Sequence, residues 1–203
     1  MSGVAGWYGK LPALGDFASR RLPQEWIDQW DGWLAAGLHG LREAAPETWL
    51  NDYLASPAWR FALLPGCLPD GSGDGLRVGV MIPSVDRVGR YFPLVVISPA
   101  MPRPVDGAQV AALWHWAGQL EETAVSALHD DWTAEALDAA LADLPMPAAT
   151  PVDPALPPAL TALLGQAAWD GLHGCSLWLH AATGPTVQPA LPQGAAFAAL
   201  FRP

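Results

Sequence analysis

The chain has 203 residues, of which 51% are hydrophobic and 15% charged, and its formal net charge at pH 7 is −10. The apolar content excludes intrinsic disorder, which combines low hydrophobicity with high charge. The acidic balance argues against a nucleic-acid partner, which would need a basic face. No apolar run reaches the roughly 18 residues that span a bilayer, and the first residues lack the features of a signal peptide. We therefore expect one cytoplasmic domain, residues 1–203, with no direct membrane insertion.

The charge is distributed unevenly along the chain. Residues 1–103 carry nine basic and ten acidic side chains, a net charge of −1, whereas residues 104–203 carry ten acidic side chains and only Arg202, a net charge of −9. This excess of acid is typical of a solubilising surface, and it would also steer a basic partner towards the protein. The sequence leaves both interpretations open.

The N-terminal part is predicted to contain one strand and two helices. Residues 7–11 form the strand, which Pro12 ends. A helix begins at Pro23, a residue suited to the first helical position, and its apolar side chains recur at intervals of three and four residues. These side chains are Ile27, Trp30, Leu34, Leu38 and Leu41. A shorter helix begins at Pro46 and ends before Pro57, because proline cannot continue a helix.

Three strands are predicted next, over residues 60–64, 76–82 and 91–98. The last of them contains the run Leu-Val-Val-Ile at 94–97, which is typical of a strand that is buried on both faces. The connections between these strands are short, so we expect neighbouring strands to pair antiparallel.

The second half of the chain is predicted to be mostly helical. Helices over residues 106–128 and 133–144 each begin at a residue that can cap a helix N-terminus, Asp106 and Thr133. The proline-rich segment 145–158 is predicted to be an extended loop. The remaining predicted elements are a short helix, a strand and a closing helix, at residues 160–166, 176–180 and 194–201.

Together these elements predict an α+β domain in which a mainly antiparallel sheet of about five strands is covered by helices. The pattern leaves open whether the helices lie on one face or on both, which would give a three-layer α/β/α sandwich. Tryptophan is abundant, with 11 residues. Its helical spacing favours a role in the core, whereas two or three exposed indoles would mark a binding surface.

Two segments contain residue types that bind metals, but neither has the required pattern. Residues 70–75 begin like a calcium loop, yet Met81 stands where a bidentate glutamate is needed. His173, Cys175 and His180 are close in sequence, but Cys175 and His180 point to opposite faces of the predicted strand. Two cysteines are also too few for a disulfide framework. We therefore expect no metal and no other cofactor.

The common catalytic motifs are missing from the sequence. It has no Gly-x-Ser-x-Gly elbow, no Gly-Lys-Ser/Thr phosphate loop and no His-Glu-x-x-His pair. Ser84, Asp86 and a histidine could be assembled into a hydrolytic set, but their spacing alone does not support one. We expect that the protein is not an enzyme, and a small hydrolase that uses Ser84 or Asp86 stays as the alternative.

The loop over residues 83–93 is the most informative segment, because it places polar residues between two apolar strands. These residues are Ser84, Asp86, Arg87, Gly89 and Arg90. Arginine forks bind carboxylates and phosphates. An internal pair between Asp86 and an arginine would fix the loop, whereas an outward arginine would contact a partner, and both interpretations are open.

The turn formed by Gly15, Asp16 and Phe17 has a similar character, and Arg20 follows it. The carboxylate of Asp16 is suited to accept hydrogen bonds from backbone amides of the turn. Phe17 is expected to fill the core.

Several segments, taken together, resemble a known family. Residues 6–17 contain Gly-Trp-Tyr-Gly-Lys-Leu-Pro and Gly-Asp-Phe, and residues 22–34 contain Leu-Pro and Trp-Asp-Gly-Trp-Leu. Residues 81–94 read Met-Ile-Pro-Ser-Val-Asp-Arg-Val-Gly-Arg-Tyr-Phe-Pro-Leu, and Ser-Pro-Ala-Trp-Arg-Phe at 56–61 fits as well. The chain resembles the TagF (ImpM) family of type VI secretion system-associated proteins, closely in its first half and loosely in its second.

This resemblance implies a bacterial cytoplasmic accessory protein without known enzymatic activity. Family members are post-translational repressors of type VI secretion, and the implied partner is a scaffold protein with a forkhead-associated domain. A structural subunit of the secretion apparatus is a further alternative. The family supplies no catalytic residues, and the matching positions, which are candidates for partner binding or loop organisation, are Gly15, Asp16, Phe17, Ser84, Asp86, Arg87, Gly89 and Arg90.

Overall fold

The structure is a computed structural model of the chain, and it describes residues 3–68, 75–104, 106–147, 169–180 and 184–201. The predicted helix at 160–166, and most of the loops predicted at 70–75 and 145–158, lie outside the described residues. None of the helices in the described part of the chain has the length and apolar character that a bilayer crossing requires.

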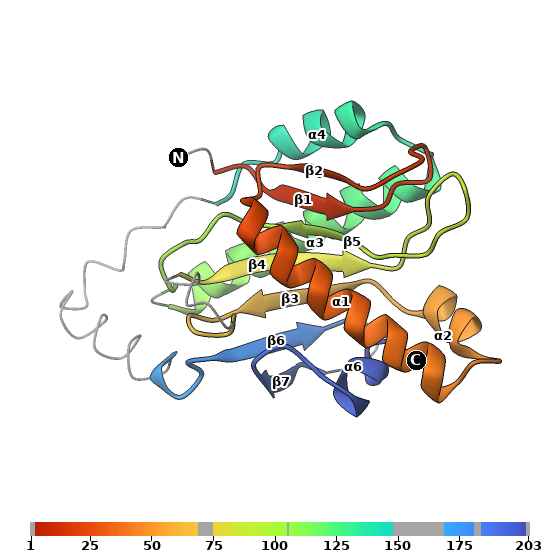
Figure 1. The fold of residues 1–203 in the computed structure, drawn as a ribbon. Coiled ribbons are helices and arrows are strands. Elements are labelled where there is room, and N and C mark those ends of the chain that lie inside the picture. The colour runs from red at the N-terminus through yellow and green to blue at the C-terminus, as the bar shows by residue number, and fades with distance from the viewer. Residues whose placement is uncertain (1–2, 69–74, 105, 148–168, 181–183, 202–203) are drawn as a thin grey trace, which may run out of the picture.

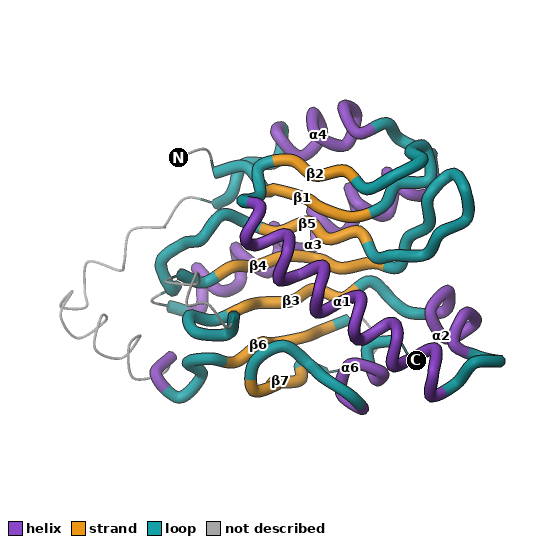
Figure 2. Tube along the Cα trace, viewed as in Figure 1, coloured by secondary structure: helices purple, strands orange, loops and turns teal. Residues whose placement is uncertain are grey.

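One sheet of seven strands forms the centre of the fold, and every neighbouring pair of strands is antiparallel. The strands in chain order are β1 (Gly6–Gly9), β2 (Ala18–Arg20), β3 (Trp59–Leu63), β4 (Arg77–Ile82), β5 (Leu94–Ile97), β6 (Cys175–Leu179) and β7 (Thr186–Pro189). Across the sheet their order is β2-β1-β5-β4-β3-β6-β7. The first strand of the chain is therefore a neighbour of β5, and the late strand β6 is a neighbour of β3 (Figure 2).

Helices cover both faces of this sheet (Figure 1). One face carries α1 (Gln24–Ala44), α2 (Trp49–Ala55) and α6 (Ala195–Ala199), and the other carries α3 (Gly107–His129) and α4 (Ala134–Ala142). The arrangement confirms the predicted α+β class, and it is the three-layer α/β/α alternative.

The helices form where the sequence pattern placed them. The apolar stripe of α1 is buried from Trp26 to Leu41, because residues three and four apart lie on the same face of a helix. Pro23 is the N-cap of α1, one residue before the predicted position. The Asp106 carboxylate accepts a hydrogen bond from the N–H of Gln109 at 2.8 Å, and Thr133 caps α4 in the same way, so both predicted caps are confirmed.

A cluster of aromatic rings fills the space between α1 and the sheet. The Trp30 ring centroid lies 5.0 Å from that of Trp26 and 5.2 Å from that of Phe61, and the Phe61 ring contacts Trp178 at 5.1 Å. Six of the 11 tryptophans are buried and the other five are partly buried. The predicted core role of tryptophan is therefore confirmed, and no indole is exposed as a binding surface.

The predicted number of about five strands is too low, because both edge strands were missed. β2 has three residues, and β7 has four that are mostly exposed, so neither has the apolar alternation that marks a half-buried strand. The strand predicted over residues 91–98 is shorter in the structure. Residues 91–93 stay in the preceding loop, where the N–H of Phe92 donates to the carbonyl of Ser84 at 3.1 Å.

Gly9, at the end of β1, permits a close approach of β1 to the start of β5. Its φ is +138°, and a Cβ at this position would lie 2.2 Å from the carbonyl oxygen of Pro93. Any other residue would require both an unfavourable backbone conformation and a displacement of the neighbouring strand.

We expect Gly9→Ala to lower the free energy of unfolding by about 2–3 kcal/mol, since backbone strain and overpacking each cost about 1–3 kcal/mol. The matched control is Gly40→Ala on α1, where a Cβ would meet nothing within 4 Å and a helix interior gains up to about 1 kcal/mol from the exchange. Chemical denaturation of both variants checks the prediction, and equal stability of the two would contradict it.

Candidate functional site

The two loops that the sequence singled out meet at one end of the sheet (Figure 1). Residues 10–17 join β1 to β2, and residues 83–93 join β4 to β5. Because β1 and β5 are antiparallel neighbours, the end of β1 and the start of β5 bring these loops side by side. The N–H of Arg87 donates to the carbonyl of Leu14 at 2.8 Å, and the Ser84 hydroxyl donates to the carbonyl of Lys10 at 2.7 Å.

The Asp86 carboxylate is the centre of this site. Its side chain is fully buried, and it accepts four hydrogen bonds. One oxygen accepts from Lys10 Nζ at 2.6 Å and from Arg90 Nε at 2.7 Å. The other accepts from the backbone N–H groups of Val88 at 3.0 Å and Arg90 at 2.9 Å. The carboxylate thus fixes the loop internally and joins it to the residue that follows β1.

Lys10 is almost completely buried and lies between a carboxylate and an aromatic ring. Its Nζ is 2.6 Å from the Asp86 carboxylate and 4.1 Å from the centroid of the Phe17 ring. A cation over a ring face is attracted by the ring quadrupole. The ammonium group is therefore stabilised from two sides, which a buried charge requires.

The electrostatics of the site favour the ionised form of Asp86. Burial by itself raises the pKa of this carboxyl, but the hydrogen bonds from Lys10, Arg90 and Val88 outweigh burial. Their net effect holds the pKa of Asp86 well below its ordinary value of 3.8.

The Ser84 hydroxyl is buried and engaged in structural hydrogen bonding. It donates to the Lys10 carbonyl, while the backbone of Ser84 forms two hydrogen bonds with the Tyr53 hydroxyl on α2, at 2.8 and 2.9 Å. All five histidines lie on other elements: His39 on α1, His115 and His129 on α3, and His173 and His180 on either side of β6. The hydrolytic set considered for Ser84, Asp86 and a histidine is not assembled.

The two arginines of the loop have different roles. Arg90 is exposed at the surface but folds back over the loop, where it pairs with Asp86 and donates to the Gly15 carbonyl. Arg87 is exposed, and only its backbone N–H is bound, to Leu14. Gly89 completes the turn between them with a φ of +84°, a conformation that favours glycine.

The Gly15–Phe17 turn, residues 15–17, covers the buried pair. Asp16 accepts a hydrogen bond from the N–H of Phe17 at 2.8 Å and lies 3.6 Å from Arg90 Nη2. Phe17 is 42% exposed, which differs from the expectation that it fills the core. Its ring stacks on Tyr8 at 5.5 Å and shields Lys10, so it acts as a cover.

Arg20 lies outside the hydrogen-bond network of Asp86, although it lines the same cleft as Phe17. It is on β2, its guanidinium is 5.8 Å from the Trp7 ring, and it pairs with Glu135 on α4 at 3.6 Å. The structure therefore brings together the other eight candidates but leaves Arg20 on the α4 side of the sheet edge.

Lys10 and Tyr53 were not among the predicted site residues, although both hold the loop in place. Lys10 is the single lysine in a chain with nine arginines. Arginine is the basic residue used everywhere else, so a lone lysine could have indicated a position with a specific role. Tyr53 carried no signal, since its spacing on α2 was that of an ordinary core residue.

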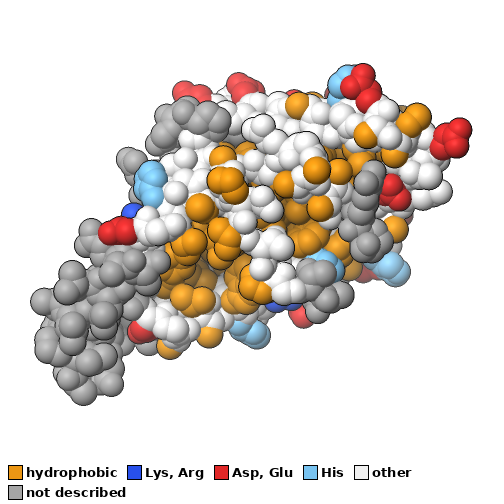
Figure 3. Space-filling model, turned by 90° about the horizontal axis from the view of Figure 1, so that it is seen from below, with side chains coloured by type: hydrophobic (Ala, Val, Ile, Leu, Met, Phe, Trp, Pro, Cys, Tyr) orange, Lys and Arg blue, Asp and Glu red, His pale blue; other side chains and the backbone are white. Residues whose placement is uncertain are grey.

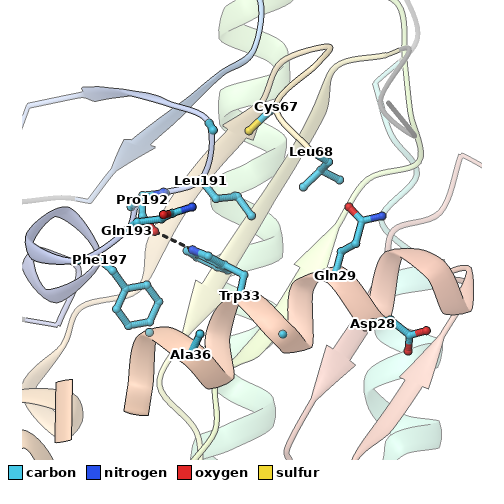
Figure 4. Close-up of a pocket in the computed structure, with 14 residues that line it drawn as sticks. Asp28, Gln29, Trp33, Ala36, Cys67, Leu68, Leu191, Pro192, Gln193 and Phe197 are labelled. Atoms are coloured by element: carbon cyan, nitrogen blue, oxygen red, sulfur yellow. Dashed lines mark hydrogen bonds between the residues drawn. The ribbon is translucent and has the colours of Figure 1, made fainter. Parts of the chain in front are cut away.

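A separate cavity of about 530 Å³ lies between α1 and the segment that precedes α6 (Figure 4). The Trp33 indole points into it and donates to the carbonyl of Pro192 at 2.7 Å. The Cys67 thiol also lines it, and burial raises the pKa of that thiol to about 12. Because the thiolate is the nucleophilic form, this shift disfavours reaction of the Cys67 thiol near neutral pH.

A smaller apolar hollow, of about 210 Å³, lies between α3 and the β6 side of the sheet. Its lining includes Leu113, Trp114 and Leu177. Figure 3 shows the molecule from the side on which β6 and β7 lie, and hydrophobic side chains are gathered across this side. Its described lining residues are all apolar or aromatic, and the Trp169 indole N–H among them donates to the Pro104 carbonyl at 2.8 Å.

The residues considered for a metal remain separate in the structure. The Cys175 thiol lies 3.9 Å from the His173 carbonyl, and the His180 ring packs against Trp59. Within residues 3–68, 75–104, 106–147, 169–180 and 184–201, no three histidine, cysteine or acidic side chains are grouped as metal ligands.

The fold and site therefore define an α/β/α sandwich that presents a braced loop at one end of its sheet. The sequence matches the family described as TagF N-terminal domain, type VI secretion system-associated, over residues 6–144. The chain belongs to the TagF family, and both loops of the site lie within the matched region.

A solved structure supports the same assignment. The chain is similar to PA0076 from Pseudomonas aeruginosa PAO1, with 36% sequence identity and a TM-score of 0.78, over 98% of this chain and 94% of that chain. No curated protein matches the sequence. The similarity extends beyond residue 144, so it includes β6 and β7 as well as the matched region.

We expect Arg90→Ala to lower Tm by several degrees and Arg87→Ala to leave it unchanged within about one degree, because surface substitutions without partners usually cost little. Arg90 supplies a hydrogen bond to buried Asp86, whereas the Arg87 side chain supplies none. Thermal unfolding of the two variants measures the difference. Equal losses of Tm would show that the loop is not braced through Arg90.

The stability that Asp86 contributes should depend on pH in a defined direction. Because its folded pKa is lower than the unfolded value of about 3.8, the contribution is complete above that value and is lost as the pH falls below it. We expect wild type to exceed Asp86→Asn in unfolding free energy by a constant amount from pH 5 to 7, and by less at pH 3. Urea unfolding across this range measures the gap, and a gap that is independent of pH would contradict the ionised state.

Proposed function

We propose that this protein is a non-catalytic cytoplasmic repressor of a bacterial type VI secretion system, acting after translation by binding another protein. Membership of the TagF family supports the association with type VI secretion. The partner that we propose is a scaffold protein with a forkhead-associated domain. We further propose that residues 1–203 act as a single domain, because the sheet draws strands from both ends of the chain.

One observation carries the choice of binding over catalysis. The loop over residues 83–93 is held by buried charges that are all compensated within the fold, while Arg87 and Val88 at its tip are exposed. A rigid loop that presents an arginine and an apolar side chain is suited to protein contact, since arginine is enriched among residues that dominate binding energy.

The hydrolase alternative lacks support from the same geometry. A serine nucleophile needs a base within hydrogen-bonding reach, and the Ser84 hydroxyl is instead bonded to a backbone carbonyl in a buried position. Asp86 is neutralised by two cations, so it is poorly placed to remove a proton from a substrate.

Deletion of the gene should raise type VI secretion, and expression of the wild-type chain should lower it again. Arg87→Ala should accumulate to the wild-type level and fail to restore repression. The matched control is Arg103→Ala, which removes an arginine that pairs with Asp170 and should repress normally. Secreted effector protein in the culture medium is the readout, and unchanged secretion after deletion would contradict the proposed function.

A further inference from the structure

Arg87 differs from the other basic side chains because its charge is not compensated. It is the one described basic side chain for which the structure gives no carboxylate, carbonyl or ring contact to the guanidinium. The two loops hold three cations, Lys10, Arg87 and Arg90, and two carboxylates, those of Asp16 and Asp86, and the carboxylates pair only with Lys10 and Arg90. This cluster therefore retains one positive charge, in a chain whose net charge is −10.

The backbone that carries this guanidinium is fixed before any partner arrives. The Arg87 N–H is bound to Leu14 at 2.8 Å, and Asp86 fixes the next residue, Val88, through its N–H. A Cβ on Gly15 would lie 3.5 Å from Arg87 Nη2, so the guanidinium lies beside a residue that has no side chain to cover it. Preorganised contacts lower the entropy that is lost on binding.

Exposed apolar side chains lie on the same two loops as the free charge. Val88 is 64% exposed and Phe17 is 42% exposed, and these are two of the six large hydrophobic side chains that are exposed among the described residues. On its other side, Phe17 forms one wall of an open cleft of about 590 Å³ that also contains Asp28 and Asp31. Arg20 also lines this cleft, so its charged lining has two carboxylates against one guanidinium. This net negative charge makes the cleft a less favourable place for an acidic group than Arg87 is.

We infer that Gly15, Phe17, Arg87 and Val88, which we name the Arg87 surface, bind a carboxylate of an acidic segment in the partner protein, next to an apolar side chain of that segment. This inference rests on the proposed function. The guanidinium forms the two parallel hydrogen bonds of an arginine–carboxylate pair, and Val88 and Phe17 contact the apolar neighbour and exclude water from the pair.

A protein fits this surface better than a lipid membrane. Anionic membranes attract clusters of about four to eight basic residues, whereas the Arg87 surface offers one uncompensated charge within an acidic chain. A single guanidinium beside two apolar side chains is the composition of an interface centre, where arginine and apolar anchors lie together.

The test measures binding of the purified scaffold protein, the partner proposed above, to the wild-type chain and to variants by calorimetry. We expect Arg87→Ala and Arg87→Glu to weaken binding by roughly 30-fold or more, and Arg87→Lys to weaken it less, because lysine keeps the charge but loses the fork. Val88→Ser should weaken binding moderately, and the control Arg103→Ala should bind as wild type. Replacement of one scaffold Asp or Glu by Arg should restore binding of Arg87→Glu.

Each other outcome overturns a specific statement. If wild type binds and Arg87→Glu binds equally well, the Arg87 surface is not the interface and the proposed function stands. If wild type does not bind the scaffold, the proposed partner fails and this inference fails with it. If phosphatase treatment of the scaffold abolishes binding to the wild-type chain, the group bound by Arg87 is a phosphate and not a carboxylate. If the chain binds phosphatidylglycerol vesicles and this binding depends on Arg87, the partner of the Arg87 surface is a membrane and not a protein.

Discussion

The buried ion pair between Lys10 and Asp86 is the interaction on which the candidate site depends. Transfer of two charges out of water is costly, and a buried pair is tolerated only when further hydrogen bonds satisfy both groups. Asp86 meets this condition with three additional donors, from Val88 and Arg90, and Lys10 meets it with the ring of Phe17. Each of these contacts also fixes part of a loop. The interactions that compensate the buried charges are therefore the ones that determine the conformation of the site.

The sheet topology makes this pair possible. Lys10 directly follows β1 and Asp86 lies in the loop that precedes β5, and β1 and β5 are antiparallel neighbours. Gly9 lets the two backbones approach closely at this point. The site is therefore supported by rigid strands, which hold a binding surface more accurately than free loops do.

The same network separates the two arginines of the loop. Arg90 completes the shell of Asp86, and once that shell is filled the carboxylate has no position left for Arg87. The Arg87 guanidinium thus remains at the surface, because Asp86 already accepts four hydrogen bonds from other groups. The family match covers both loops, whereas β6, which lies beyond it, contributes Trp178 to the core beneath α1.

The sequence by itself determined the elements whose period is strong. The stripe of α1, the caps of α3 and α4 and the apolar run of β5 were all predicted, because helical spacing, capping chemistry and two-sided burial are local properties. The α+β class followed from their order, and the motifs around Asp16 and Asp86 indicated the TagF family. The edge strands β2 and β7 were not predictable, since pairing with a neighbour creates them.

Only the tertiary structure decided how the loop residues are used. Arg87 and Arg90 are three residues apart in one loop, and the sequence does not distinguish them. No local rule predicts that Arg90 binds Asp86 while Arg87 remains free. The role of Lys10 depends on a partner 76 positions away, and that of Tyr53 on one 31 positions away. Such contacts exist only after β1, β4 and β5 have paired, because the sheet brings those residues within hydrogen-bonding distance.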